Sequence, residues 1–169
     1  MKRMVFADHL QEKEKEYGPE NVVYIDETGF QKYAYRPHGW ALRGQKIVGD
    51  VSGNNRKCTN LILARAGSRH FAPMLFEGTC DAKVFNTWVH RVLLPCLIRP
   101  SIVVLDNAAF HVRSAIQKIL SAFGHAVLFL PPYSPDLNPI EHSFDTLKDF
   151  RLSLPQNTSI DTVIKLFIN

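Results

Sequence analysis

Three carboxylates occupy positions from which they could meet at one site. Asp26 ends the apolar run VVYID, and Asp106 ends a second apolar run, SIVVLD. Glu141 follows the proline-rich stretch LPPYSPDLNPI, and 34 residues separate it from Asp106. Three carboxylates at one point repel each other unless cations join them, and hard oxygen ligands favour magnesium or manganese over zinc. We therefore expect these residues to form a divalent metal site.

Each of these acids also has a simpler explanation when it is taken alone. Asp106 could cap the helix that follows it, and Glu141 could simply favour the N-terminus of a helix. Two aspartates at the ends of strands, together with a glutamate that a loop delivers, are harder to explain separately. The combination favours the metal site.

The flanking sequence indicates how the three acids would be positioned. Residues 22–25 and 102–105 are short apolar runs that suit buried central strands, and ligand sites form at the ends of such strands. The prolines before Glu141 prevent a helix before Pro139. Asn138 is a good N-cap and Pro139 a good first helical residue, which places Glu141 in the first turn, facing the sheet.

The rest of the chain reads as alternating strands and helices. Helices are predicted at 4–17 (with Met4, Ala7 and Leu10 as a weak apolar face), 81–98, 112–123 and 139–152, and further strands at 46–51, 59–66, 70–76 and 126–130, the last of them buried. A capping box at 158–161 introduces an amphipathic stripe within 153–169, which either packs on the core or forms a partner surface. This order predicts an α/β fold with a mixed sheet flanked by helices.

Composition favours one globular domain over residues 1–169, with a surface helix within 1–20. No apolar run is long enough to span a membrane, and the charged N-terminus does not resemble a signal peptide. The three cysteines, Cys58, Cys80 and Cys96, are odd in number and lack metal-ligand spacing, which favours a reducing cytoplasm.

Basic residues are concentrated in the first half of the chain. Residues 32–69 contain eight basic side chains and one acid, a balance that suits a phosphodiester polymer. For any single lysine, a solvated strand face is the better explanation, and for Trp40 a place in the core is an equally good one. The candidate DNA-binding residues are Lys32, Arg36, Trp40, Arg43, Lys46, Arg56 and Lys57.

Four ordered motifs, YIDETGF, GWALRGQ, VVLDNAAFH and LPPYSPDLNPIEHSFDTLK, resemble the catalytic domain of mariner-type transposases, in particular the bacterial insertion-sequence branch. That family has an Asp, Asp, Glu triad with the spacing found here. The resemblance implies a ribonuclease H-like fold with Asp26, Asp106 and Glu141 as ligands of two magnesium (or manganese) ions. It also implies cut-and-paste transposition at TA sites, transposon ends and target DNA as partners, self-association on DNA, and a bacterial, nucleoid-associated location.

Other polar residues near the expected site could support it or act locally. Asn107 could support the neighbouring ligand Asp106. His111 could contact the scissile phosphate or assist proton transfer, or it could pack or cap locally. Glu27 should point to the opposite face of its strand from Asp26.

Two other functions remain open at this stage. Only 25 residues precede Asp26, too few for the helix-turn-helix modules of full-length relatives, so we expect those modules to be absent. The chain could accordingly be a non-catalytic DNA-binding remnant or a partial product of a transposase gene. A structure-specific nuclease on the same fold is a further alternative, and it would cleave DNA without joining it.

Overall fold

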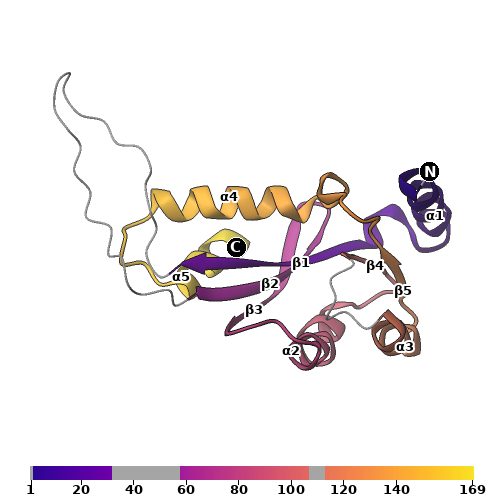
Figure 1. Cartoon of the computed structure of the whole chain (residues 1–169), viewed down its shortest axis with the longest axis horizontal. Coiled ribbons are helices and arrows are strands. Elements are labelled where there is room, and N and C mark those ends of the chain that lie inside the picture. Colours follow the sequence, from indigo (N-terminus) through magenta and orange to yellow (C-terminus); the bar gives the residue numbers. More distant parts are fainter. Residues whose placement is uncertain (1, 32–57, 107–112) are drawn as a thin grey trace, which may run out of the picture.

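The computed structural model describes residues 2–31, 58–106 and 113–169, which form one five-stranded mixed sheet with the strand order β3-β2-β1-β4-β5 (Figure 1). The antiparallel half contains β1 (Val22–Gln31), β2 (Cys58–Ala66) and β3 (Arg69–Glu77). The parallel half adds β4 (Ile102–Leu105) beside β1 and β5 (Ala126–Phe129) at the edge. The predicted mixed sheet is confirmed, and the predicted strand at 46–51 lies outside the described residues.

Helices cover both faces of the sheet. On one face, α2 (Ala82–Trp88) and α3 (Arg113–Ala122) pack against alternate residues of the central strands, such as Ile25 and Leu105. On the other, α4 (Ile140–Ser153) and α5 (Ile160–Ile168) cover the antiparallel half, and α1 (Lys2–Tyr17) covers the parallel half. Successive side chains of a strand point to opposite faces of the sheet, so Ile25 lies on the first face and Tyr24 on the second.

The helix predicted at 81–98 begins as expected but changes geometry along its length. The side chain of Asp81 accepts a hydrogen bond from the backbone N–H of Val84 and so caps the start of the helix. The α-helix ends at Trp88, a π-helical turn follows over Val89–Leu93, and a 3-10 turn over Leu94–Cys96 contains Pro95. The whole helical run stops just after Pro95, because proline has no backbone N–H to donate to the preceding turn.

The predicted apolar face of the N-terminal helix is confirmed at Leu10 and wrong at Met4 and Ala7. Met4 is 70% exposed and Ala7 is also exposed, whereas Phe6 is buried against the parallel half of the sheet with Leu10 beside it. Burial of the large ring of Phe6 removes more apolar surface from water than burial of Met4 and Ala7 would. The helix lies on the surface but is packed onto the core.

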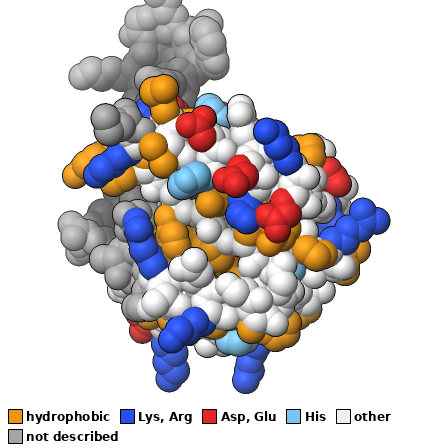
Figure 2. Space-filling view, turned by 90° about the vertical axis from the view of Figure 1, so that its right-hand side faces the viewer, with side chains coloured by type: hydrophobic (Ala, Val, Ile, Leu, Met, Phe, Trp, Pro, Cys, Tyr) orange, Lys and Arg blue, Asp and Glu red, His pale blue; other side chains and the backbone are white. Residues whose placement is uncertain are grey.

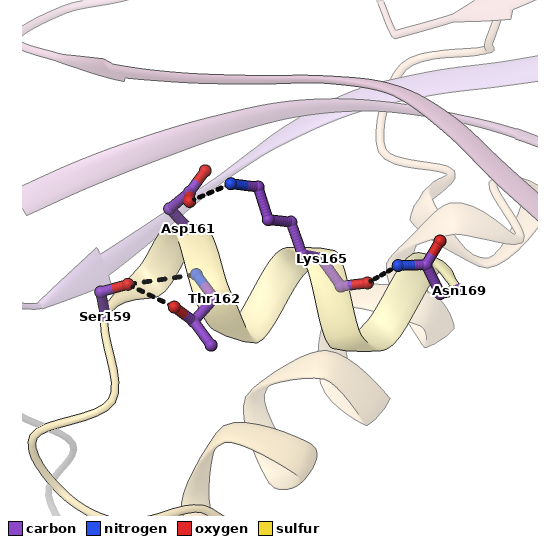
Figure 3. A network of polar contacts seen from close by, with 5 residues as sticks. All are labelled: Ser159, Asp161, Thr162, Lys165 and Asn169. Atoms are coloured by element: carbon purple, nitrogen blue, oxygen red, sulfur yellow. Dashed lines mark hydrogen bonds and ion pairs between the residues drawn. The ribbon is translucent and has the colours of Figure 1, made fainter.

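Two further expectations need correction. The strand at 126–130 was predicted to be buried, but β5 is only half-buried because it is the edge strand, with one neighbour. The last helix is capped by Ser159 and not by a box that starts at Thr158. The Oγ of Ser159 accepts a hydrogen bond from the backbone of Thr162 over 3.1 Å (Figure 3).

The amphipathic stripe of the last helix packs on the core. Val163 and Ile164 are buried with residues of β1, β2 and α4. Along the outer surface of the helix, Lys165 pairs with Asp161 over 2.7 Å (Figure 3). Of the two alternatives for this stripe, packing on the core is confirmed. None of the helices in the described ranges has the length and apolar character that crossing a membrane requires.

Candidate active site

The register of the two central parallel strands brings the first two acids together. Ile25 of β1 pairs with Leu105 of β4, so Asp26 and Asp106 are the next residues along neighbouring strands. Ile25 and Leu105 both face the α2 side, and the following residues face the opposite side by strand alternation. The two aspartates therefore stand side by side on one face. Asp106 directly follows the end of β4, as predicted, but β1 does not end at Asp26: it continues to Gln31 in antiparallel pairing with β2, so Asp26 lies where the pairing with β4 ends and not where its strand ends.

Glu141 reaches the same place from the other side. The chain leaves β5 at Phe129, passes through a loop with a short 3-10 turn (Pro135–Leu137), and enters α4 at Ile140. Glu141 lies in the first helical turn, as predicted. A cavity of about 370 Å³ is lined by all three acids and by the loop: Asp26, Asp106, Leu130, Pro131, Pro132, Tyr133, Ser134, Pro135, Asn138 and Glu141.

Asp26 is held by two hydrogen bonds, one to each carboxylate oxygen. The backbone N–H of Glu27 donates to Oδ1 over 2.8 Å, and the side-chain amide of Asn138 donates to Oδ2 over 2.8 Å. These bonds fix the plane of the carboxylate, and each oxygen keeps a lone pair for a cation. The loop before α4 is thereby tied directly to β1.

Asn138 was predicted to be the N-cap of this helix, and that prediction is wrong. The N-cap is Pro139, which makes no side-chain cap. The backbone carbonyl of Asn138 accepts the N–H of Glu141 over 3.1 Å, but its side chain turns to Asp26 instead. Its Oδ1 is buried without a hydrogen-bond partner in the described structure, a placement that costs about 1–3 kcal/mol.

Electrostatic repulsion is visible in the pKa of Asp26. Burial is the main cause that raises this pKa, and the negative charges of Glu141, Asp106 and Glu27 raise it further, to about 8. The hydrogen bond from the backbone of Glu27 opposes the shift without cancelling it. A carboxyl group with a pKa this high indicates a site where negative charge is not compensated. A bound cation would provide the compensating positive charge.

Glu27 lies on the opposite face of β1 from Asp26, as the strand alternation predicts. It forms a hydrogen bond with Cys80, and its Oε2 is buried without a partner among the described residues. Burial and the nearby charge of Asp106 raise the pKa of Glu27 to about 7, and burial raises that of the Cys80 thiol to about 12. Glu27 therefore adds negative charge near Asp26 but does not line the cavity.

The start of α4 is fixed to the sheet by a buried polar cluster. Nη1 of Arg65 donates to the carbonyl of Pro139 over 2.6 Å and to Oγ of Ser143 over 2.9 Å. His70 Nε2 lies 2.8 Å from the same Oγ, and burial lowers the pKa of His70. A neutral imidazole can accept the hydroxyl proton that Ser143 has left to donate. This cluster orients the turn that carries Glu141.

Sequence reasoning did not find this cluster. Arg65 was counted among the basic residues that suit a polyanion, but its guanidinium is turned inward to α4. The far end of α4 is held similarly, since Arg151 donates to the carbonyl of Gln31 at the end of β1 over 2.8 Å. No spacing in the sequence signals these contacts, because each joins residues 73 or more positions apart.

The donor set fits a magnesium or manganese ion, since it consists of carboxylate oxygens on a shared cavity. Within residues 2–31, 58–106 and 113–169, no three His, Cys, Asp or Glu side chains already converge as a ready-made metal cluster. The three acids instead line one shared cavity, which is where an ion would bind. The residues to hold it are Asp26, Asp106 and Glu141.

The other predicted site residues lie outside the part of the chain that the structure describes. These are the two candidates for support of the site and the seven candidates for DNA binding: Asn107, His111, Lys32, Arg36, Trp40, Arg43, Lys46, Arg56 and Lys57. Their roles stay predictions.

A mixed sheet with helices on both faces and two aspartates side by side on its central parallel strands is the arrangement of a ribonuclease H-like domain, and comparisons with known structures agree. The Mos1 strand transfer complex matches with a TM-score of 0.73 at 23% identity, over 98% of this chain and 51% of that one. A mariner Mos1 paired-end complex with Mg gives 0.72 at 22% identity, over 98% and 52%. The catalytic domain of Mos1 mariner transposase gives 0.60 at 20% identity, over 97% and 76%.

Residues 21–164 match the family described as DDE superfamily endonuclease, and the chain belongs to that family. Curated protein sequences give no match. The chain spans about half the length of the first Mos1 chains that it matches. The fold is similar to that of the Mos1 transposase catalytic domain, which confirms the ribonuclease H-like expectation.

The raised pKa of Asp26 predicts how stability varies with pH. Its folded pKa of about 8 exceeds the ordinary value of 3.8, so the folded protein holds more protons than the unfolded chain between these values. Without divalent metal, the free energy of unfolding should therefore fall as pH rises from 5 to 8. Asp26→Asn removes this group and should flatten the fall by about 1–3 kcal/mol. Urea unfolding in EDTA at several pH values measures it.

Asp149→Asn is the matched control, because Asp149 is exposed on α4. This variant should keep the wild-type slope of unfolding free energy against pH. An unchanged slope in Asp26→Asn would show that Asp26 ionises normally in the folded protein.

The bond from Asn138 to Asp26 predicts a separation between metal affinity and stability. Asn138→Leu removes the donor and also removes the unpartnered Oδ1, so stability should stay within about 1 kcal/mol of wild type. Loss of the group that orients a ligand should weaken Mn²⁺ binding about 10- to 100-fold. Calorimetric titration with Mn²⁺ and thermal unfolding test the two parts. Wild-type affinity in Asn138→Leu, with Asn169→Leu as control, would contradict this role.

Proposed function

We propose that this chain is the catalytic domain of a mariner-type DNA transposase of the bacterial insertion-sequence branch. The observation that carries the proposal is the shared cavity of Asp26, Asp106 and Glu141, which three distant segments build in a chain of the DDE superfamily endonuclease family. Its reaction is the hydrolysis of phosphodiester bonds at transposon ends, followed by joining of the 3′ ends to target DNA. Cut-and-paste movement into TA sites is the expected outcome.

Two magnesium or manganese ions fit this reaction. When bound, they would activate the attacking oxygen and stabilise the leaving oxygen of an in-line displacement at phosphorus. Asp26 and Asp106 would hold them from the sheet, and Glu141 from α4. The backbone of Glu27 and the amide of Asn138 keep the carboxylate of Asp26 in a fixed orientation while the substrate changes.

The same site suits both steps, because only the nucleophile differs between them. A water molecule attacks in hydrolysis, and a DNA 3′-hydroxyl attacks in joining. Self-association on DNA is part of the proposal, and one of the similar Mos1 structures is a paired-end complex. The expected partners are transposon ends and target DNA, and the expected location is the bacterial cytoplasm, in association with the nucleoid.

Substitution of the proposed ligands tests the function. Asp106→Asn and Glu141→Gln each keep the shape of the side chain but remove a negative oxygen ligand. Nicking of a short DNA duplex with Mg²⁺ or Mn²⁺ should fall about a thousandfold or more in each, since metal-assisted charge stabilisation contributes several kcal/mol. Asp149→Asn, two turns beyond Glu141 on the exposed side of α4, should cut at the wild-type rate.

The outcomes separate the proposal from its alternatives. Equal activity in wild type and Asp106→Asn would remove that aspartate from the site. Salt-sensitive DNA binding with no cleavage under either metal would favour a non-catalytic remnant. Cleavage without joining to a second duplex would favour a structure-specific nuclease.

A further inference from the structure

One residue in the loop before α4 has an unusual backbone and an unusual exposure. Tyr133 has a φ of +56°, in the left-handed region that a bulky side chain rarely adopts. Its side chain is 99% exposed, so the ring gains almost no packing in return for this conformation. Strained residues of this kind are concentrated at binding and catalytic sites, where a ligand uses the side chain that the strain presents.

The surroundings of Tyr133 indicate what that ligand is. The cavity that Tyr133 lines is also lined by the three carboxylates and by the apolar side chains of Leu130, Pro131, Pro132 and Pro135. The carboxylates suit a phosphate with its cations. The apolar side chains, together with an exposed aromatic ring, suit the flat face of a nucleobase.

The loop is built to hold the ring in one place. Prolines at 131, 132 and 135 restrict the backbone on both sides of Tyr133. Ser134 is buried at 5% exposure, and its carbonyl accepts the N–H of Leu137 over 3.1 Å. Asn138 ties the end of the loop to Asp26. A tyrosine on a rigid support loses little conformational freedom when it stacks on a ligand.

The apolar part of this lining also borders a basic region. A groove between α1 and β5 shares Leu130, Pro131 and Pro132 with the cavity, and Lys2, His9 and Arg113 also line it. No acid is among its described lining residues. On the end of the molecule that carries α1 and α3, basic and acidic side chains lie among exposed hydrophobic ones (Figure 2). Such a groove suits the phosphates of a strand that continues past the cavity.

We propose that Tyr133 stacks on the nucleobase next to the phosphodiester that occupies the carboxylate cavity, and so holds the DNA strand in position for reaction. The inference rests on the proposed function, because it takes DNA as the substrate. Stacking on one aromatic face accepts any base, so this subsite positions the strand without reading its sequence. Tyr133 is in this account a substrate-binding residue that the triad does not include.

Photocrosslinking tests the contact directly. A set of short duplexes carries 5-iodouracil at successive positions of one strand, and ultraviolet light links the base to an aromatic ring stacked on it. The wild-type protein should give a crosslinked peptide that contains Tyr133. Tyr133→Phe should retain the crosslink and bind DNA within about twofold of wild type, whereas Tyr133→Ala should lose the crosslink and bind about tenfold more weakly.

Two further variants separate stacking from a structural role. Tyr133→Gly relieves the left-handed backbone, so its unfolding temperature should equal or exceed that of wild type while its DNA binding is as weak as that of Tyr133→Ala. Phe123→Ala removes another exposed aromatic ring, 59% exposed just beyond α3, and should leave binding and crosslinking unchanged. Loss of DNA binding that follows loss of stability across these variants would overturn the inference.

The same experiment distinguishes failure of the inference from failure of the proposed function. A crosslink at Tyr133 in a protein that cuts no DNA under any metal would leave the stacking site standing and remove the catalytic function. Cleavage by a protein whose Tyr133→Ala variant binds and crosslinks like wild type would overturn the stacking site alone. Absence of DNA binding by the wild-type protein would overturn both.

Discussion

The parallel pairing of β1 with β4 is the constraint on which the candidate site depends. With Ile25 opposite Leu105, two aspartates that are 80 positions apart in the sequence become neighbours on one face of the sheet. A shift of one residue in either strand would turn one of them toward the α2 side. Because both strands are buried between packed helices, their apolar side chains fix this register strongly, and the fold can place like charges side by side.

Burial and mutual repulsion of these carboxylates are unfavourable, and polar contacts partly offset them. Burial and, to a smaller extent, the neighbouring negative charges raise the pKa of Asp26, and two hydrogen bonds hold its carboxylate in place. The amide of Asn138 is buried with its own oxygen unpartnered, so the donor to Asp26 is kept at some expense in stability. Hydrogen bonds from Arg65 to the carbonyl of Pro139 and to the hydroxyl of Ser143 hold the helical turn that carries Glu141. The backbone of the site is therefore held in place while its carboxylates repel each other, and this combination suits the binding of cations.

The sequence predicted those features that depend on local pattern. Apolar runs that end in aspartate located β4 and the first part of β1, and the prolines before Glu141 located the start of α4. The continuation of β1 to Gln31 was missed because it depends on pairing with β2. Contacts between distant segments could not be found in this way. The side chain of Asn138 satisfies the rule for an N-cap, but a carboxylate 112 positions earlier competes for its amide and wins. Phe6 was overlooked because one buried aromatic side chain creates no periodicity, and Arg65 because its charge alone suggested a polyanion.

The central claim is that carboxylates from β1, β4 and α4 form a divalent metal centre, and anomalous diffraction from crystals soaked in Mn²⁺ tests it most directly. The account predicts manganese density in the cavity, within ligand distance of Asp26, Asp106 and Glu141, and loss of that density in Asp106→Asn. Manganese bound only elsewhere on the protein, or bound in the cavity equally well without Asp106, would contradict it.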